Sequence, residues 1–169
     1  MTAKRFTALI VLVAAERVLE LVVSKRNLKW SIAQGGREFG ADHYPVMVAL
    51  HSALLVGAVV EARRRRPSSV LGRVMVAVVL AAQALRWRCI TTLGRQWNTR
   101  VVVVPGAARV ADGPYRVIPH PNYVAVVTEG AALPLAGGAW ITALVFTVAN
   151  AALLRTRIRI ENEALQGLS

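Results

Sequence analysis

The sequence predicts an all-α integral membrane protein of about five transmembrane helices, with a long polar connection and a C-terminal helix that continues beyond the last apolar run. Of the 169 residues, 55% are hydrophobic, and the mean hydropathy is +0.46. Only 18% are charged, below the roughly 25% that is usual in soluble domains. The apolar residues are also gathered into long runs, as transmembrane helices require.

Five apolar runs approach the roughly 20 residues that a helix needs to cross a bilayer. They cover residues 6–23, 45–60, 70–85, 123–135 and 140–154. Because several are short, we expect tilted or partly interfacial helices. The uncharged segment 133–138 contains Pro134, Gly137 and Gly138, which favours a tight turn and makes the last two helices a hairpin.

The charge is strongly positive, with 21 Lys and Arg against 9 Asp and Glu and a formal net charge of +12. Such a charge can indicate nucleic-acid binding. Here the basic residues lie between apolar runs, so basic cytoplasmic loops explain them better and no nucleic acid is expected. With five spans and a cytoplasmic C-terminus, 13 basic residues fall inside and 7 outside. The cluster Arg63–Arg66 falls outside, so either it is tolerated there or one span does not cross.

Two polar stretches separate the apolar runs, at residues 24–44 and 86–121. Functional residues often lie on loops held by a rigid scaffold, so the second stretch is the better place to search for a site. Within it, the run Val101–Val104 ends at Pro105-Gly106, which predicts a small hairpin under the membrane surface. The single cysteine, Cys89, allows no internal disulfide and supplies no metal-ligand spacing.

The segment 113–123 is rich in polar and rigid residues and directly precedes an apolar helix. Pro121 suits the first turn of that helix, where a missing N–H group costs nothing. The other N–H groups of the turn and the helix dipole favour an anion, toward which His120 would point. The segment therefore either binds a small carboxylate or phosphate, or merely shapes the start of a helix.

Charged residues continue past the last apolar run. Arg157 with Glu161, and Arg159 with Glu163, are four residues apart and share helix faces. Taken alone, this pattern is typical of a solvated helix end with weak ion pairs, and less often of a site.

Ionisable residues also interrupt the apolar runs themselves. Glu16 and Glu20 are four residues apart with Arg17 beside them, and His51 and Glu129 lie in other runs. Such residues are costly in a bilayer and usually face a bundle interior or a polar cavity. Glu16, Glu20, His51 and Glu129 are therefore candidates for a substrate cavity, or else for a structural cluster.

The two motifs together resemble the isoprenylcysteine carboxyl methyltransferase family, whose pattern is Gly-x-Tyr, Arg-His-Pro-x-Tyr and an Arg- and Glu-rich helix ending near Glu-Glu-x-x-Leu. The matching positions are Gly113, Tyr115, His120, Pro121, Tyr123, Arg157, Glu161 and Leu165. The resemblance is strong from about residue 93 to the C-terminus. The first ninety residues, and the tract 93–106 in particular, are similar to a bacterial branch associated with O-methylation of alkylpyrone- and alkylresorcinol-type lipids made by type III polyketide synthases.

The chain departs from the family pattern at two positions. Pro119 stands where the family usually has Arg, and Asn162 stands where it often has the second Glu. The first change removes a cation that could bind a carboxylate, for which neighbouring Arg116 could compensate.

The resemblance implies S-adenosyl-L-methionine as methyl donor, bound in a cytoplasm-facing pocket. Gly113 and Pro121, which match the family motif, would belong to this pocket. The donor's carboxylate would lie near His120, and its sulfonium would favour the aromatic faces of Trp97, Tyr115 and Tyr123. Glu161 would hold the amino group or ribose, or act as a base on a hydroxyl, and Arg157 would orient the acceptor oxygen. The absence of any Gly-x-Gly spacing excludes a soluble Rossmann-type methyltransferase.

The implied protein is one methyltransferase domain, 1–169, in the bacterial inner membrane. Residues 1–92 would form the first three helices, and 93–169 the cofactor-binding and catalytic region. The acceptor would be an alkylpyrone- or alkylresorcinol-like lipid, which the branch favours, or an isoprenylcysteine-like carboxylate. Two alternatives remain: an NADPH-dependent membrane sterol-type reductase, whose chains are longer, and a non-enzymatic membrane subunit whose basic loops meet anionic lipid.

Overall fold

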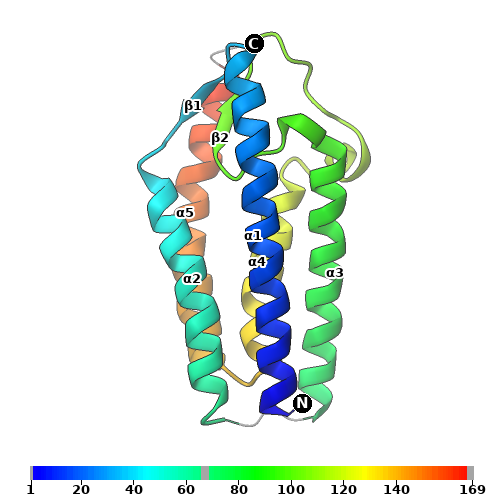
Figure 1. The fold of residues 1–169 in the computed structure, drawn as a ribbon, viewed down its shortest axis with the longest axis vertical. Coiled ribbons are helices and arrows are strands. Elements are labelled where there is room, and N and C mark those ends of the chain that lie inside the picture. Colours follow the sequence, from blue (N-terminus) through cyan, green and yellow to red (C-terminus); the bar gives the residue numbers. More distant parts are fainter. Residues whose placement is uncertain (1, 66–68, 167–169) are drawn as a thin grey trace.

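The computed structural model describes residues 2–65 and 69–166, and five long helices dominate it (Figure 1). The helices are α1 (Ala3–Ala33), α2 (His43–Ala62), α3 (Ser69–Leu93), α4 (Pro121–Ala136) and α5 (Trp140–Gln166). Short elements connect them: strands β1 (Arg37–Phe39) and β2 (Val101–Val103), and 3-10 turns η1 (Gly94–Gln96) and η2 (Gly113–Arg116). The predicted all-α membrane fold is confirmed.

The helices stand side by side and alternate in direction (Figure 1). The N-terminus, the α2–α3 connection and the α4–α5 turn lie at one end of the bundle, at the bottom of the view. The α1–α2 and α3–α4 connections and the end of α5 lie at the other, which we call the loop-rich end. Arg63–Arg65 follow α2 and therefore lie opposite the loop-rich end, whereas Arg66 is outside the described residues.

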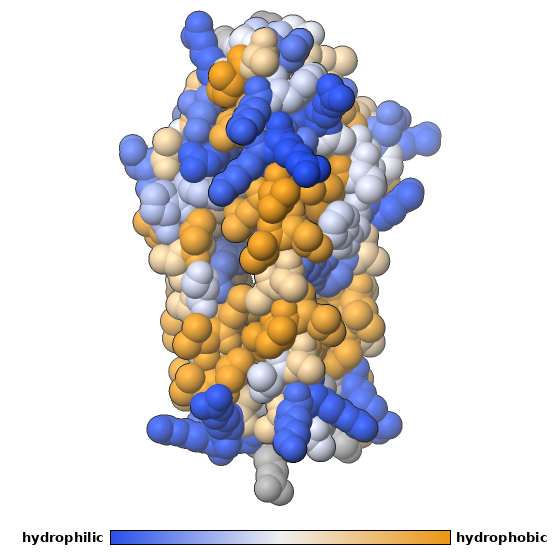
Figure 2. Space-filling view, in the orientation of Figure 1, coloured by the Kyte–Doolittle hydropathy of each residue, from blue (hydrophilic) through white to orange (hydrophobic). Residues whose placement is uncertain are grey.

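The middle of the bundle exposes apolar side chains, in a band between two hydrophilic ends (Figure 2). Leu12, Leu80 and Val148 are 68%, 60% and 64% exposed. Side chains of this kind on several helices need lipid tails as their surroundings. Within residues 2–65 and 69–166, three helices are long and apolar enough to cross a membrane by length and composition: α2, Val70–Gln96 and α5. Of the others, α4 has only 16 residues, and α1 contains the charged segment 16–20.

A small-residue face lets α4 approach its neighbours closely. Ala132 and Ala136 on α4 pack with Phe6 and Ile10 of α1 in the main buried cluster. A side chain at Gly130 would overlap the Phe146 ring of α5. Small residues play this role in membrane bundles generally, because packing rather than hydrophobicity drives association there. The predicted hairpin of the last two helices is present, with α5 beginning at Trp140 directly after the 137–139 turn.

Two sequence-based expectations were wrong in detail. Helices α1 and α3 extend well beyond the apolar runs that predicted them, because their polar residues remain helical outside the apolar band. Helix α5 continues past the last apolar run, as expected. The Val101–Val104 run forms no local hairpin. Strand β2 instead pairs antiparallel with β1, with Glu38 opposite Val102, because the ends of α1 and α3 bring these distant segments together.

Candidate active site

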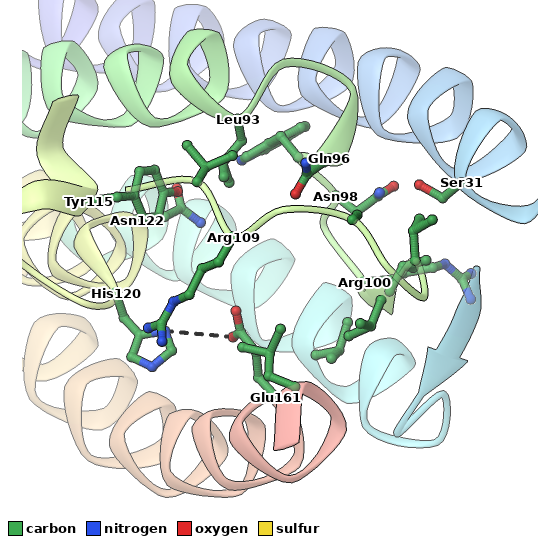
Figure 3. A pocket seen from close by; sticks show the side chains of 18 of the residues that line it. Ser31, Leu93, Gln96, Asn98, Arg100, Arg109, Tyr115, His120, Asn122 and Glu161 are labelled. Carbon is green, nitrogen blue, oxygen red and sulfur yellow. Dashed lines mark ion pairs between the residues drawn. The ribbon is translucent and has the colours of Figure 1, made fainter. Parts of the chain in front are cut away.

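Two cavities meet near the loop-rich end. The outer cavity, of about 190 Å³, lies among the 93–110 segment, η2, the start of α4 and the end of α5, and Figure 3 shows it from close by. The inner cavity, of about 160 Å³, lies deeper, among the side chains of α1, α2, α4 and α5. Residues common to both linings are Trp97, Asn98, Asn122, Tyr123 and Arg157. These five residues form what we call the shared wall.

A hydrogen-bonded chain of side chains runs through the shared wall. Arg157 is only 6% exposed, and its Nε donates to the Tyr123 hydroxyl at 3.0 Å. The Tyr123 hydroxyl donates in turn to Glu161. The terminal nitrogens of Arg157 donate to the Thr99 carbonyl at 2.5 Å and to the Met47 sulfur at 2.9 Å. The Tyr123 hydroxyl is therefore fixed between a guanidinium and a carboxylate.

His120 stands at the start of α4, as predicted, with Pro121 as the first helical residue. Its ring stacks on Tyr123 with centroids 5.4 Å apart, and its Nδ1 lies 3.8 Å from the Glu161 carboxylate (Figure 3). The backbone N–H groups of Tyr123 and Val124 both donate to the His120 carbonyl. These two groups are therefore not free to bind an anion, so a side-chain cation close by would help to bind a carboxylate here.

Arg109 is a cation that can meet such a carboxylate. It lines the outer cavity, and its side chain extends toward the side where His120 and Glu161 lie (Figure 3). Arg116, expected to replace the arginine that Pro119 displaces, is exposed and is not part of the cavity lining. Arg109, from the loop before η2, therefore occupies this part of the site, and Arg116, which is close to Pro119 in the sequence, does not.

Gly113 and Tyr115 have different roles in η2. Gly113 has a φ of +54°, and a side chain there would meet Thr92, so glycine is needed to form the turn. The turn places Tyr115 in the cavity lining, with its hydroxyl beside the Cys89 thiol. Burial, with the neighbouring Cys89, raises the pKa of the Tyr115 phenol far above its usual value, so the hydroxyl stays protonated at neutral pH.

Helix α1 holds the loop that carries Trp97 and Asn98. The Asn27 amide donates to the Gly94 and Trp97 carbonyls at 3.0 and 2.7 Å. Ser24 is hydrogen-bonded to both the backbone N–H and the hydroxyl of Thr99. These contacts make the loop a rigid part of the bundle.

Several buried polar atoms beside the cavities have no hydrogen-bond partner within the described part of the chain. They are Trp97 Nε1, both amide atoms of Asn98, Asn122 Oδ1 and Asn150 Oδ1. Each of these residues lines at least one cavity. An unpaired buried polar group is destabilising, so the cavities are complementary to polar groups of ligands. The sequence analysis selected Trp97 but missed the asparagines, which carry neither charge nor a motif spacing.

The predicted intramembrane residues form a network that we call the polar layer. Glu20 accepts from Arg17 at 2.5 Å and from Arg86 at 2.5 Å. Arg17 also donates to Glu129 and to Gln83, and Glu16 accepts from Gln83 and Trp87. The layer joins α1, α3 and α4 within the apolar band.

The residues of the polar layer differ in whether they line the inner cavity. Glu20 and His51 line the inner cavity, as expected for a substrate cavity, together with Arg17 and Arg86. Glu16 and Glu129 belong to the polar layer without being part of that lining, as members of a structural cluster would.

The structure therefore brings most of the sequence-predicted site together. The residues of the predicted site that line the outer cavity are Trp97, Tyr115, His120, Tyr123, Arg157, Glu161 and Leu165. Gly113 and Pro121 do not line it but shape the backbone that places Tyr115 and Tyr123.

Comparison with known proteins agrees with this architecture. The chain is 38% identical over 167 residues to an uncharacterised Bacillus subtilis protein, YpbQ, covering 97% of this chain and 98% of the relative. It is 26% identical over 158 residues to an uncharacterised Haemophilus influenzae protein, covering 92% of each chain. No solved structure matches it. Residues 75–167, which include η2, α4 and α5, match the isoprenylcysteine carboxyl methyltransferase (ICMT) family. The chain belongs to this family of membrane methyltransferases.

Proposed function

We propose that the protein transfers a methyl group from S-adenosylmethionine to an oxygen atom of a lipophilic acceptor. The observation that carries this proposal is the meeting of two unlike cavities at one wall. The outer cavity lies among polar loops and the inner cavity lies within the apolar band. A polar donor and a lipophilic acceptor can thus be held next to each other where both cavities reach Tyr123 and Arg157. Methyl transfer is an in-line displacement, for which such positioning is the main requirement.

The residues of the outer cavity fit the cofactor. The Arg109 guanidinium suits its carboxylate, and the Glu161 carboxylate suits its ammonium group. The faces of Tyr115 and Tyr123 suit a sulfonium cation. The unpaired N–H of Trp97 and amide of Asn98 supply donors and acceptors for the remaining polar atoms. When bound, the cofactor would supply an electrophilic methyl group.

The shared wall supports an acceptor oxygen that must lose a proton. Tyr123 lies beside both cavities and is hydrogen-bonded to Glu161, so a proton from a hydroxyl in the inner cavity could pass through Tyr123 to that carboxylate. Arg157 has more N–H groups than its three partners use, and one could stabilise the developing oxyanion. A hydroxyl acceptor of the alkylpyrone or alkylresorcinol kind uses this relay, whereas an isoprenylcysteine-like carboxylate needs no base.

We further propose that the loop-rich end faces the cytoplasm of a bacterium, with the bundle in the inner membrane. Arg95, Arg100 and Arg109 lie in the α3–α4 connection at this end, as the positive-inside rule requires. The uncharged 137–139 turn lies at the opposite end.

Calorimetric titration of the detergent-purified protein with S-adenosylmethionine and S-adenosylhomocysteine tests the cofactor. We expect saturable binding of both, weakened roughly tenfold or more in His120→Ala and Arg109→Ala, because each removes a polar or charged contact. Arg116→Ala is the matched control: it removes the same charge from the same connection outside the cavity, and should bind normally.

NADPH is titrated beside them, because the reductase interpretation predicts that it binds. Folded protein that binds neither adenosyl compound would contradict the proposal.

A further inference from the structure

We infer that the inner cavity contains a second polar subsite, formed by Asn150 and His51, that binds a hydroxyl group of the acceptor remote from the oxygen that is methylated. The inference rests on the proposed function, because it takes the inner cavity to be the acceptor site. It would make Asn150 and His51 specificity-determining residues.

The Asn150 side chain is polar, buried and incompletely hydrogen-bonded within the described residues. It lies on α5 within the apolar band, is 2% exposed, and lines the inner cavity but not the outer one. Its Oδ1 has no hydrogen-bond partner among residues 2–65 and 69–166. Within a bilayer no bulk water can satisfy such an atom. A ligand that donates a hydrogen bond would do so.

His51 supplies a second acceptor atom. Its Nδ1 lies 2.9 Å from the Met47 carbonyl oxygen. A carbonyl only accepts, so in this contact Nδ1 carries the proton, and Nε2 of the neutral ring is an acceptor. Nε2 is not engaged in this contact and can accept a hydrogen bond. His51 also lines the inner cavity.

The two residues lie in the same part of the bundle. The His51 ring meets the Phe146 ring edge-on, with centroids 5.2 Å apart. Phe146 and Asn150 are four residues apart on α5 and therefore share a face. Asn150 and His51 thus line the inner cavity from α5 and α2, on either side of the Phe146 contact.

Helix geometry gives the separation from the reacting oxygen. Asn150 lies seven residues from Arg157 on α5, or about 10 Å along the axis. His51 lies four residues from Met47, the partner of Arg157 on α2, or about 6 Å. The second hydroxyl of the acceptor should therefore lie roughly 6–10 Å from the methylated oxygen.

The subsite itself favours a neutral donor over an anion, because the two atoms that it offers are acceptors. The basic residues of the lining are Arg17, Arg86 and Arg157. Arg17 and Arg86 are both paired with Glu20, and Arg157 is held by Tyr123 and Thr99. The two acceptor atoms of the subsite would repel an anionic group further.

The test compares two probes, 5-pentylresorcinol and its analogue with a hydroxyl at the end of the pentyl chain. Their dissociation constants are measured on protein in nanodiscs saturated with S-adenosylhomocysteine. The quantity of interest is the ratio of the two constants, because it cancels general effects on the cavity. We expect Asn150→Leu to shift this ratio roughly fivefold against the hydroxylated probe, the value of one neutral hydrogen bond.

Leu153→Ala is the matched control. It changes an apolar residue of the same lining on the same helix, and should weaken both probes while leaving the ratio unchanged. Asn150→Leu should also raise the melting temperature of the ligand-free protein by a few degrees, because it removes an unpaired buried amide. A purely structural asparagine would lower the melting temperature instead.

A ratio that is the same in wild type and Asn150→Leu would overturn the subsite. So would binding of S-adenosylhomocysteine without binding of either probe, and in both cases the proposed function would stand. If S-adenosylhomocysteine itself does not bind to folded protein, the proposed function fails, and the subsite with it.

Discussion

The polar layer gives the sharpest prediction about stability. Arg86 donates to Glu20 through Nε at 2.5 Å and through a terminal nitrogen at 3.1 Å, and its Nη1 lies 3.9 Å from Glu129. The Arg86→Met substitution keeps most of the side-chain volume and removes the charge. Glu20 and Glu129 would then share Arg17 as their one remaining partner in the layer.

The magnitude follows from burial. The side chains of Arg86 and Glu20 are 9% and 2% exposed, so little water can replace the lost contact. Breaking one side of a buried ion pair typically costs about 3–5 kcal/mol, because the remaining charge is uncompensated. We expect Arg86→Met to destabilise the folded protein by about that amount. The double variant Glu20→Gln/Arg86→Met also removes the uncompensated Glu20 charge. It should recover at least about 1 kcal/mol of the stability lost in Arg86→Met.

The assay is unfolding of the purified protein in mixed micelles with increasing denaturing detergent, followed by tryptophan fluorescence. Arg88→Met is the control, since Arg88 lies two residues away on the same helix but is exposed, and it should change stability by less than about 0.5 kcal/mol. If Arg86→Met were as mild as Arg88→Met, the layer would be hydrated or dispensable, and the account of it would be wrong.

Three further substitutions probe the site and its support. Tyr123→Phe removes the link between the inner cavity and Glu161, so the rate constant for methyl transfer to a hydroxyl acceptor should fall roughly 100-fold or more, while calorimetry should show cofactor affinity changed much less. Asn27→Ala leaves the carbonyls of Gly94 and Trp97 unpaired, so it should lower stability by about 1–3 kcal/mol and weaken cofactor binding in the same titration. Gly130→Ala places a methyl group against the Phe146 ring, and should lower stability by about 1–3 kcal/mol in the detergent unfolding assay without changing cofactor affinity in the folded protein.

The fold was predictable because the bilayer imposes a simple rule on helix composition. The five apolar runs gave the number and order of the helices and the final hairpin. They did not give the helix ends, because residues such as Ser24 and Asn27 continue α1 while facing a loop instead of lipid. The β1–β2 pairing could not be predicted from the sequence for a similar reason, since it depends on how far α1 and α3 extend.

The site was predictable where a motif carries it. His120, Tyr123, Arg157 and Glu161 were selected because they match the motifs of the family that the chain resembles, and the structure places them around one cavity. Arg109 was missed because it lies in an irregular loop, where sequence distance says little about spatial distance.

The asparagines were missed for another reason. An unpaired amide such as that of Asn150 can be identified only when the surrounding cavity and every potential partner are known.

The central claim is that a methyl group passes from S-adenosylmethionine to an oxygen atom of a lipophilic acceptor. An isotopically labelled methyl group tests this claim most directly. Membranes containing the protein are incubated with S-adenosylmethionine carrying a deuterated methyl group, and the lipid extract is analysed by mass spectrometry beside membranes containing His120→Ala. We predict a lipophilic product that carries the deuterated methyl as an ether or ester, and that is absent from the His120→Ala membranes. Equal labelling of the lipid extract in both samples, or no labelled lipid from membranes whose protein binds the cofactor, would contradict the account.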